Sequence, residues 1–177
     1  MKKIIVLLFC LSAICASNVF AQKKGDMYVG GTVGFGLTTY TSEEVKLSDF
    51  TGIITPEYSY FVADNFRIGA ELSFNLADNG AIFNLSPSFA YYLELVDNFY
   101  FTPEITIGGG LIAGKNLALG AFSLGINLVG FELRPTKHVG ISLNIDNTSY
   151  LFLPKDSASS IHFAIVPSLA LGFRYYL

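Results

Sequence analysis

The sequence predicts an all-β fold, and three observations lead to that prediction. Apolar and polar residues alternate through most of the chain, so that one face of each extended segment is apolar. Few stretches place apolar residues at the i, i+3, i+4 and i+7 spacing of an amphipathic helix. Glycine, which destabilises helices, occurs 17 times. These patterns favour a single domain built from strands.

About eight segments alternate in this way, each close to the ~9 to 11 residues that a tilted strand needs to cross a bilayer. In chain order they are 27–38, 50–60, 66–76, 83–93, 99–111, 118–133, 139–146 and 161–177. The sixth is the least regular. The last, IHFAIVPSLALGFRYYL, has an apolar or aromatic residue at every odd position, over about three times the roughly 5 to 6 residues of an ordinary strand.

Each segment in turn has a recognisable apolar face. In the first four segments it consists of Met27, Val29, Val33, Phe35 and Leu37; Phe50, Ile54, Pro56, Tyr58 and Tyr60; Phe66, Ile68, Leu72, Phe74 and Leu76; and Phe83, Leu85, Pro87, Phe89, Tyr91 and Leu93. In the last four it consists of Phe99, Phe101, Pro103, Ile105, Ile107 and Leu111; Phe122, Leu124, Ile126 and Leu128; Val139, Ile141, Leu143 and Ile145; and the odd positions from Ile161 to Leu177. The opposite faces are mostly Gly, Ser, Thr and Asn, which fit inside a narrow barrel.

The connections divide into two kinds, which predicts two different ends of the barrel. VADN, LVDN and RPTKH follow the second, fourth and sixth segments and contain the Asp, Asn and Pro that tight turns favour. The other connections are looser. Aromatic residues gather toward the turn end at Tyr58, Tyr60, Phe66, Tyr91, Phe99, Phe101, Phe131, Phe173 and Tyr175, and toward the loop end at Tyr40, Phe50, Tyr150 and Phe152. Two aromatic bands are typical of the two interfaces of a bilayer.

The distribution of lysine indicates that the apolar face is outside. A soluble barrel that holds a ligand would also alternate, but it would scatter lysines over its wet strand faces. The lysines after residue 21 lie at positions 23, 24, 46, 115, 137 and 155, all at the start of the mature chain or in predicted loops and turns. We therefore expect an eight-stranded antiparallel transmembrane β-barrel, with its apolar face in lipid.

The first 21 residues have the features of a cleaved signal peptide. Two lysines precede an apolar run, and Val19 and Ala21 occupy the small-residue positions before the cut. Both cysteines lie in this segment, so the mature chain has no thiol chemistry. Loss of Lys2 and Lys3 leaves nine of the 11 basic residues against 14 acidic ones, a net charge of −5. This charge argues against nucleic-acid binding by the barrel domain, residues 22–177.

Five charged residues are predicted to meet inside the barrel near its turn end. They are Glu57, Arg67, Glu71, Glu104 and Arg174, all on the polar face. Because an eight-stranded barrel is just wide enough to be filled by side chains, we expect these groups to pair and close the lumen. The alternative is a hydrated lumen in which they do not touch. Replacement of the inward Gly172 by serine is expected to impair insertion much less than Tyr175→Asp on the lipid face.

Four prolines fall inside predicted strands, where each removes a ladder hydrogen bond. They are Pro56, Pro87, Pro103 and Pro167, and their surroundings repeat as TPEYSY, SPSFAYY, TPEITI and VPSLAL. The repetition predicts bulges or bends on the lipid face.

The Ala-Gln cleavage junction, the repeated Pro-x-x-x-Tyr strands and the end GFRYYL make the chain resemble the outer-membrane β-barrel domain family, relatives of OmpA/OmpX-type eight-stranded barrels. The resemblance covers the whole mature chain. It implies a location in the bacterial outer membrane with both termini periplasmic. It also implies that the last strand is the insertion signal read by the outer-membrane assembly machinery. The alternating signal residues are Leu169, Leu171, Phe173, Tyr175 and Leu177, with leucine in place of the family's usual terminal phenylalanine.

Other motifs give no catalytic, cofactor-binding or metal-ligating residues. GGTVGFG opens no helix, which a phosphate-binding loop requires. Ser160, His162 and Asp156 superficially match a hydrolase constellation, but a strand-end histidine is more often a solvated rim residue. The sequence therefore predicts a structural or interaction protein of the envelope. A narrow pore and a lipid-processing enzyme remain the alternatives, and no ligand is identified.

Overall fold

The computed structural model describes residues 22–41, 46–77, 80–114, 117–152 and 163–177. Its strands are β1 (Met27–Thr41), β2 (Lys46–Ala63), β3 (Phe66–Ala77), β4 (Gly80–Tyr91), β5 (Leu93–Val96), β6 (Phe99–Phe101), β7 (Glu104–Gly114), β8 (Leu117–Thr136), β9 (Val139–Phe152) and β10 (Phe163–Tyr176). Within these ranges, no helix is long and apolar enough to span a membrane.

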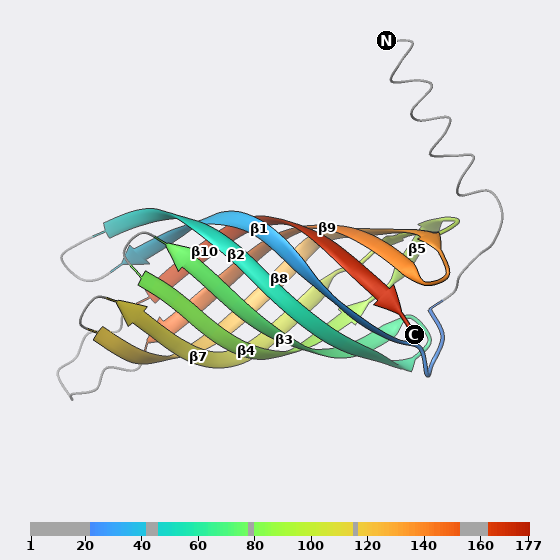
Figure 1. The fold of residues 1–177 in the computed structure, drawn as a ribbon, viewed down its shortest axis with the longest axis horizontal. Helices are drawn as coiled ribbons and strands as arrows, with labels where there is room; N and C mark the ends of the chain where they lie inside the picture. Colours follow the sequence, from blue (N-terminus) through green and yellow to red (C-terminus); the bar gives the residue numbers. More distant parts are fainter. Residues whose placement is uncertain (1–21, 42–45, 78–79, 115–116, 153–162) are drawn as a thin grey trace, which may run out of the picture.

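The strands form one closed antiparallel barrel (Figure 1). The long strands pair in chain order from β1 to β4, and β4 pairs with β7, which pairs with β8. The pairings of β8 with β9, β9 with β10 and β10 with β1 close the barrel. The eight long strands β1, β2, β3, β4, β7, β8, β9 and β10 make up the wall of the barrel. The short hairpin of β5 and β6 continues β4 and β7 beyond the rim, and β6 also pairs with β8. The predicted eight-stranded barrel is confirmed.

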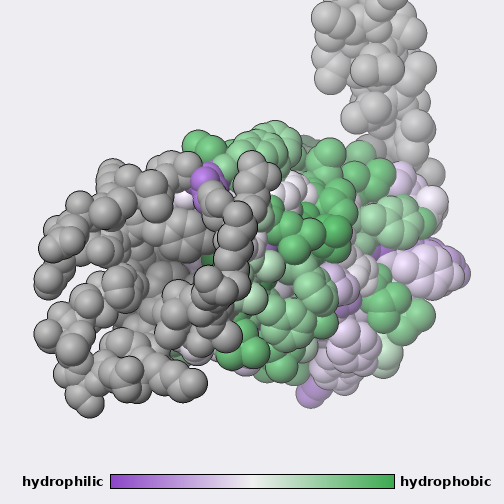
Figure 2. All heavy atoms as spheres, turned by 60° about the vertical axis from the view of Figure 1, so that its left-hand side comes forward, coloured by the Kyte–Doolittle hydropathy of each residue, from purple (hydrophilic) through white to green (hydrophobic). Residues whose placement is uncertain are grey.

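The alternation of the sequence sorts side chains between the interior and the outer wall. On β1, Val33, Phe35 and Leu37 are each more than half exposed, whereas Thr38 on the other face is fully buried. Such an apolar outer wall is stable only in lipid. Figure 2 shows this hydrophobic surface on one side of the barrel.

The strands are longer than the predicted lipid-crossing segments. β2 has 18 residues and β8 has 20. The pairing of β1 with β2 continues to Thr41 and Lys46, beyond the predicted segments 27–38 and 50–60. Hydrogen bonding between strands does not require an apolar face, so the ladder can continue past the residues that alternate.

The three predicted tight turns are confirmed and lie at one end of the barrel, which we call the turn end. Two-residue turns follow β2 and β8, and a third joins β5 to β6. Asn65 and Asn98 have φ values of 62° and 63° in these turns, a left-handed conformation that asparagine tolerates. Both ends of the described barrel lie there too, since the Asn65 amide donates to the Gln22 carbonyl and the Leu177 amide to the Met27 carbonyl, each at 2.9 Å.

Three of the four prolines do not produce the expected bulges. Register shifts occur between Phe61 and Ala63, Glu94 and Val96, Asn127 and Val129, and Leu133 and Thr136, away from Pro56, Pro87 and Pro167. Pro103 lies opposite the shift in β8, because Phe101 pairs with Phe131 whereas Glu104 pairs with Asn127.

Three of the prolines instead interrupt pairing on one side of their strand. Pro56 pairs with β1 but not β3, Pro87 with β3 but not β7, and Pro167 with β9 but not β1. A backbone N–H points toward one neighbouring strand only, so its loss removes bonds on one side and leaves the register intact. Only Pro103 breaks its strand, between β6 and β7.

Candidate functional site

The interior of the barrel holds the charged and polar side chains. Arg67 and Arg174 are each only 1% exposed, and they come from β3 and β10. Buried charges are costly unless they are paired and hydrogen-bonded. The lumen is therefore the candidate functional site.

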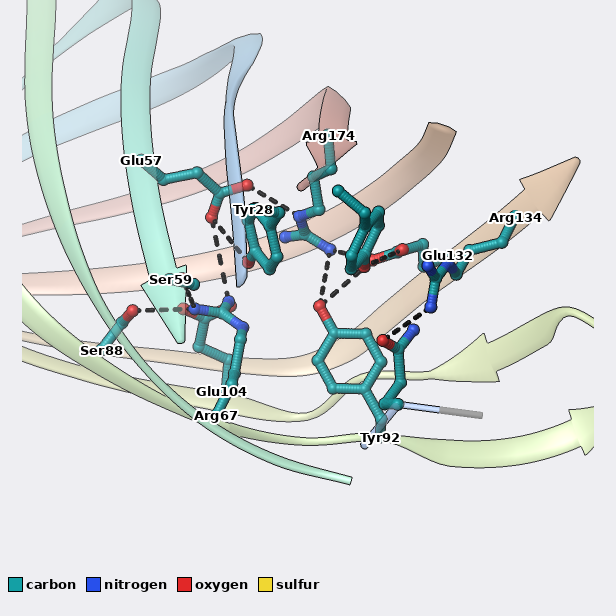
Figure 3. Close-up of polar contacts among 12 residues, drawn as sticks. Tyr28, Glu57, Ser59, Arg67, Ser88, Tyr92, Glu104, Glu132, Arg134 and Arg174 are labelled. Atoms are coloured by element: carbon teal, nitrogen blue, oxygen red, sulfur yellow. Dashed lines mark hydrogen bonds and ion pairs between the residues drawn. The ribbon is translucent and has the colours of Figure 1, made fainter. Parts of the chain in front are cut away.

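Five charged residues form an ion-pair network across the lumen (Figure 3). Arg174 binds Glu57 through Nε at 2.7 Å and Glu132 through Nη1 at 2.5 Å. Arg67 binds Glu104 at 2.6 Å and lies 3.9 Å from Glu57. Because the partners belong to β2, β3, β7, β8 and β10, the network ties together strands that are not neighbours in the wall.

Small residues make room for the Arg67 side chain. Its Nη1 donates to the hydroxyls of Ser59 at 2.9 Å and Ser88 at 3.0 Å. Gly69 stands between these serines in the register, and a Cβ there would lie 2.3 Å from the Ser59 hydroxyl and 2.6 Å from that of Ser88. Glycine at 69 thus permits the contact that holds the guanidinium.

Tyrosine hydroxyls complete the network on the Arg174 side. Tyr92 donates to Glu132 at 3.1 Å and lies 3.2 Å from Arg174 Nη1, while Tyr176 also donates to Glu132. The Tyr28 ring lies 5.2 Å and 5.6 Å from the guanidinium carbons of Arg174 and Arg67, within cation–π distance of both.

An aromatic layer fills the lumen between the network and the turn end. Its members are the buried residues Tyr28, Phe61, Tyr92, Tyr100 and Tyr176, packed with Ala90. Arg134 covers the layer, with its guanidinium carbon 3.6 Å from the centre of the Tyr176 ring. Nη1 of Arg134 donates to Gln22 Oε1 at 2.8 Å, so the start of the barrel domain also contributes to this end.

A polar cavity of about 70 Å³ lies on the loop side of the network. Its wall includes Glu57, Glu104 and Arg174 of the network, together with Thr, Ser and Asn side chains. Toward the loop end, Tyr150 and Val166 line it. They belong to a buried apolar cluster with Ile82 and Ala121, against which Ile53 packs, and we call this the upper apolar cluster. The cavity is therefore bounded by charged groups on one side and apolar groups on the other.

The five residues predicted to meet in the lumen have two different environments. Glu57, Arg67, Glu104 and Arg174 belong to the ion-pair network. Glu71 lines the cavity instead, where its carboxyl interacts with that of Glu104.

The proposed insertion-signal residues lie on the outer wall of β10 and at the chain end. Their exposed fractions run from 39% for Leu169 to 65% for Leu177. Tyr150, which the sequence suggested for an aromatic band, is buried in the lumen, and its hydroxyl accepts a 2.9 Å bond from Asn75. That assignment was wrong, because Tyr150 has the same parity as the inward residues Ser142 and Asn144 of β9.

Sequence reasoning missed Glu132 and Arg134, which are fully or almost fully buried. In β8, Ser123 and Asn127 point inward at odd positions, whereas Glu132 and Arg134 point inward at even ones. The register shift between Asn127 and Val129 causes the change. The sequence does contain a sign of this change of face, since Leu128 and Val129 are consecutive apolar residues and both are exposed on the outer wall.

Ser160, His162 and Asp156, the residues of the superficial hydrolase pattern, lie outside the described residues, as do residues 1–21. In the part of the chain that the structure describes, no group of three or more His, Cys, Asp or Glu is arranged to hold a metal ion.

Comparisons with known proteins identify the fold. No family model and no curated protein matches the sequence. The crystal structure of Neisserial surface protein A (NspA) matches 86% of this chain and 99% of its own, with a TM-score of 0.57 and 13% identity. The N-terminal β-barrel domain of Pseudomonas aeruginosa OprF also matches 86% of this chain and 99% of its own, with a TM-score of 0.51 and 12% identity. The chain has the fold of the small, eight-stranded outer-membrane β-barrels of the OmpA/OmpX type.

Proposed function

We propose that the protein is an integral outer-membrane barrel whose lumen is closed by its own side chains and which has a structural or interaction role in the bacterial envelope. The observation that carries the proposal is the ion-pair network, in which Arg174 bridges Glu57 and Glu132 across the interior. Charges held in direct contact in this way do not line a continuous water column.

Two further layers support a closed lumen. The aromatic layer with Arg134 fills the turn end, and the upper apolar cluster stands on the loop side of the cavity. An ion crossing the barrel would meet three successive obstacles of different chemistry. Opening one of them would leave the other two in place.

The location in the outer membrane is part of the proposal. Its support is the apolar outer wall, which needs lipid, and the likeness in fold to outer-membrane barrels. Both ends of the described barrel lie at the turn end, and the short turns of such barrels face the periplasm. We accordingly propose that both termini are periplasmic and that the last strand is read by the barrel assembly machinery.

A narrow pore is the second candidate, and one observation favours it. The polar cavity is lined by more carboxylates than guanidiniums, as in a cation-selective path. We propose no enzymatic role; within the described part of the chain, the lumen shows no nucleophile activated by a neighbouring base.

Single-channel recording in planar bilayers tests the closed lumen. We expect the wild type to give no steady open-channel current, because the network occupies the lumen at the level of Glu57 and Arg174. The variant Glu57→Gln weakens the network but should also give no steady current, because the aromatic layer and the upper apolar cluster remain in the lumen. Asp97→Asn, in the exposed turn between β5 and β6, is the matched control and should behave as the wild type.

Steady current from the wild type would replace the closed barrel with the pore. Folding of each variant is checked beforehand by its mobility on a gel with and without heating.

A further inference from the structure

We propose that the polar cavity binds a hard divalent cation of the calcium type, through a row of oxygen acceptors formed by Glu104, Asn127 and Asp146. This inference goes beyond the structural role proposed above, because it gives the closed lumen a specific ligand.

The strand register places the three acceptors side by side. Glu104 of β7 is the partner of Asn127 of β8, and Asn127 is in turn the partner of Asp146 of β9. All three line the cavity. Side chains that are directly opposite on neighbouring strands have Cβ atoms about 4.5 to 5.5 Å apart, so the three form one contiguous acceptor row.

Two oxygens at the cavity have no hydrogen-bond donor within the described chain. Oδ1 of Asn127 and Oδ1 of Asn144 are buried and unpartnered, and both residues are only 4% exposed. Glu104 uses Oε2 to bind Arg67, and its carboxyl also interacts with that of Glu71, a contact between two acids that calls for positive charge nearby. Leaving a buried acceptor unsatisfied costs about 1 to 3 kcal/mol. These atoms point to a ligand that offers positive charge.

The charge balance points to the same conclusion. Glu57, Glu104 and Glu132 are matched by Arg67 and Arg174 in the network, with Arg134 nearby over Tyr176. Glu71 and Asp146 also line the cavity, and in the described part of the chain no Lys or Arg nitrogen lies within ion-pairing distance of either. These two carboxyl groups thus have no basic partner among the described residues, and when both are ionised their charge equals that of one divalent ion.

The ligand atoms select the class of cation. They are carboxylate and amide oxygens without sulfur or imidazole, a set that suits hard ions rather than zinc or copper. Calcium accepts six to eight oxygens in irregular geometry, whereas magnesium demands a near-ideal octahedron. Only two members of the row are acidic, so water must supply part of the coordination. The cavity of about 70 Å³ has room for it, since one ordered water needs only about 10–15 Å³.

Direct titration tests the proposal. The mature chain is folded in a zwitterionic detergent, treated with a chelator and titrated with calcium chloride in a calorimeter, with magnesium chloride in parallel. We expect about one calcium ion per chain and weaker binding of magnesium. Asp146→Asn should weaken calcium binding by about 10- to 100-fold, the size of effect seen when a metal site loses a supporting group. Asp97→Asn, in the exposed turn, should bind as the wild type.

Thermal unfolding of the same samples gives a second readout. Without calcium, Asp146→Asn should unfold at a higher temperature than the wild type, because one excess charge is gone. Added calcium should raise the midpoint of the wild type at concentrations about 10- to 100-fold lower than those needed for the variant.

Three outcomes would overturn the proposal. One is the absence of calcium binding by the wild type. A second is equal binding by the wild type and Asp146→Asn. The third is a wild type that is stabilised by mild acid but not by calcium, since a proton would then neutralise the carboxylates.

Discussion

At the scale of single residues, Arg174 is the cation that holds two carboxylates of the lumen at 2.7 Å or less. It joins two carboxylates from different strands and also bonds the Tyr92 hydroxyl. A buried ion pair adds little net stability compared with apolar packing, but removal of one partner leaves an uncompensated charge. Removal of Arg174 is therefore expected to lower the free energy of unfolding by far more than its ion pairs contribute to it.

Replacement of Arg174 by alanine is expected to destabilise the barrel by about 3 to 5 kcal/mol, because Glu57 and Glu132 would both lose their closest cation. The measurement is the urea midpoint of the barrel refolded in lipid vesicles. Lys24→Ala removes an exposed cation at the turn end and serves as the control, with no expected change. An unchanged midpoint in Arg174→Ala would show that the network is not structural.

At Gly172, the space for a side chain is limited by residues of other strands. The sequence places this glycine on the inward face. A Cβ at this position would lie 2.1 Å from the Ser142 hydroxyl and 3.0 Å from the Thr32 methyl carbon. The lumen is packed too tightly there for any side chain without movement of Ser142, a fact that depends on the neighbouring strands and not on β10 itself.

At the scale of the strand, alternation decides which side chains meet lipid. The outward residues of β10 include Phe173 and Tyr175, both about half exposed on the outer wall. Arg174, between them, points into the ion-pair network. Neighbouring positions of one strand thus face two solvents, and a change of polarity should have opposite consequences at each.

Tyr175→Asp is expected to lower the outer-membrane yield, because a carboxylate on the lipid face near an interface costs up to about 1 kcal/mol and the substitution also removes an aromatic residue of the insertion signal. Tyr175→Phe keeps the apolar ring and should insert normally. Yield is measured by quantifying the heat-modifiable form in outer-membrane fractions of cells that express each variant. Equal yields for Tyr175→Asp and Tyr175→Phe would refute the assigned face and the role of the strand as an insertion signal.

Most of the fold could be predicted at this scale. Period-two alternation located all eight wall strands, and the Asn-containing turns fixed which ends they share. The ion pairs of Glu57 and Arg67 could be anticipated because both residues lie on regular strands. Glu132 could not be assigned inward by alternation alone, because the register shift in β8 depends on how β9 pairs with it.

At the scale of the whole molecule, polarity is inverted relative to a soluble domain. Side chains such as Phe50, Leu111 and Leu171 are more than half exposed, while the interior holds arginines and carboxylates. Water would destabilise this arrangement from outside, and lipid stabilises it.

Cell fractionation is therefore expected to recover the protein with the outer membrane. Unheated samples should migrate faster on a gel than boiled ones, because the closed barrel resists unfolding by detergent. Glu57→Gln, which weakens the ion-pair network without removing an arginine, is run on the same gel for comparison with the wild type. Recovery of the protein from the soluble periplasm would contradict its proposed location in the outer membrane.

The register shift of β8 has a consequence for how this strand can change in length. Before Leu128 the inward residues of β8 have odd numbers, and after Val129 they have even numbers. Loss or gain of one residue inside either half would turn every later side chain of that half from lipid to lumen. A compensating insertion or deletion of one residue nearby would return the later side chains to their original faces. We therefore expect β8 to accept changes of length only in steps of two residues within one half, because a change of one residue would turn charged side chains such as Glu132 and Arg134 onto the outer wall.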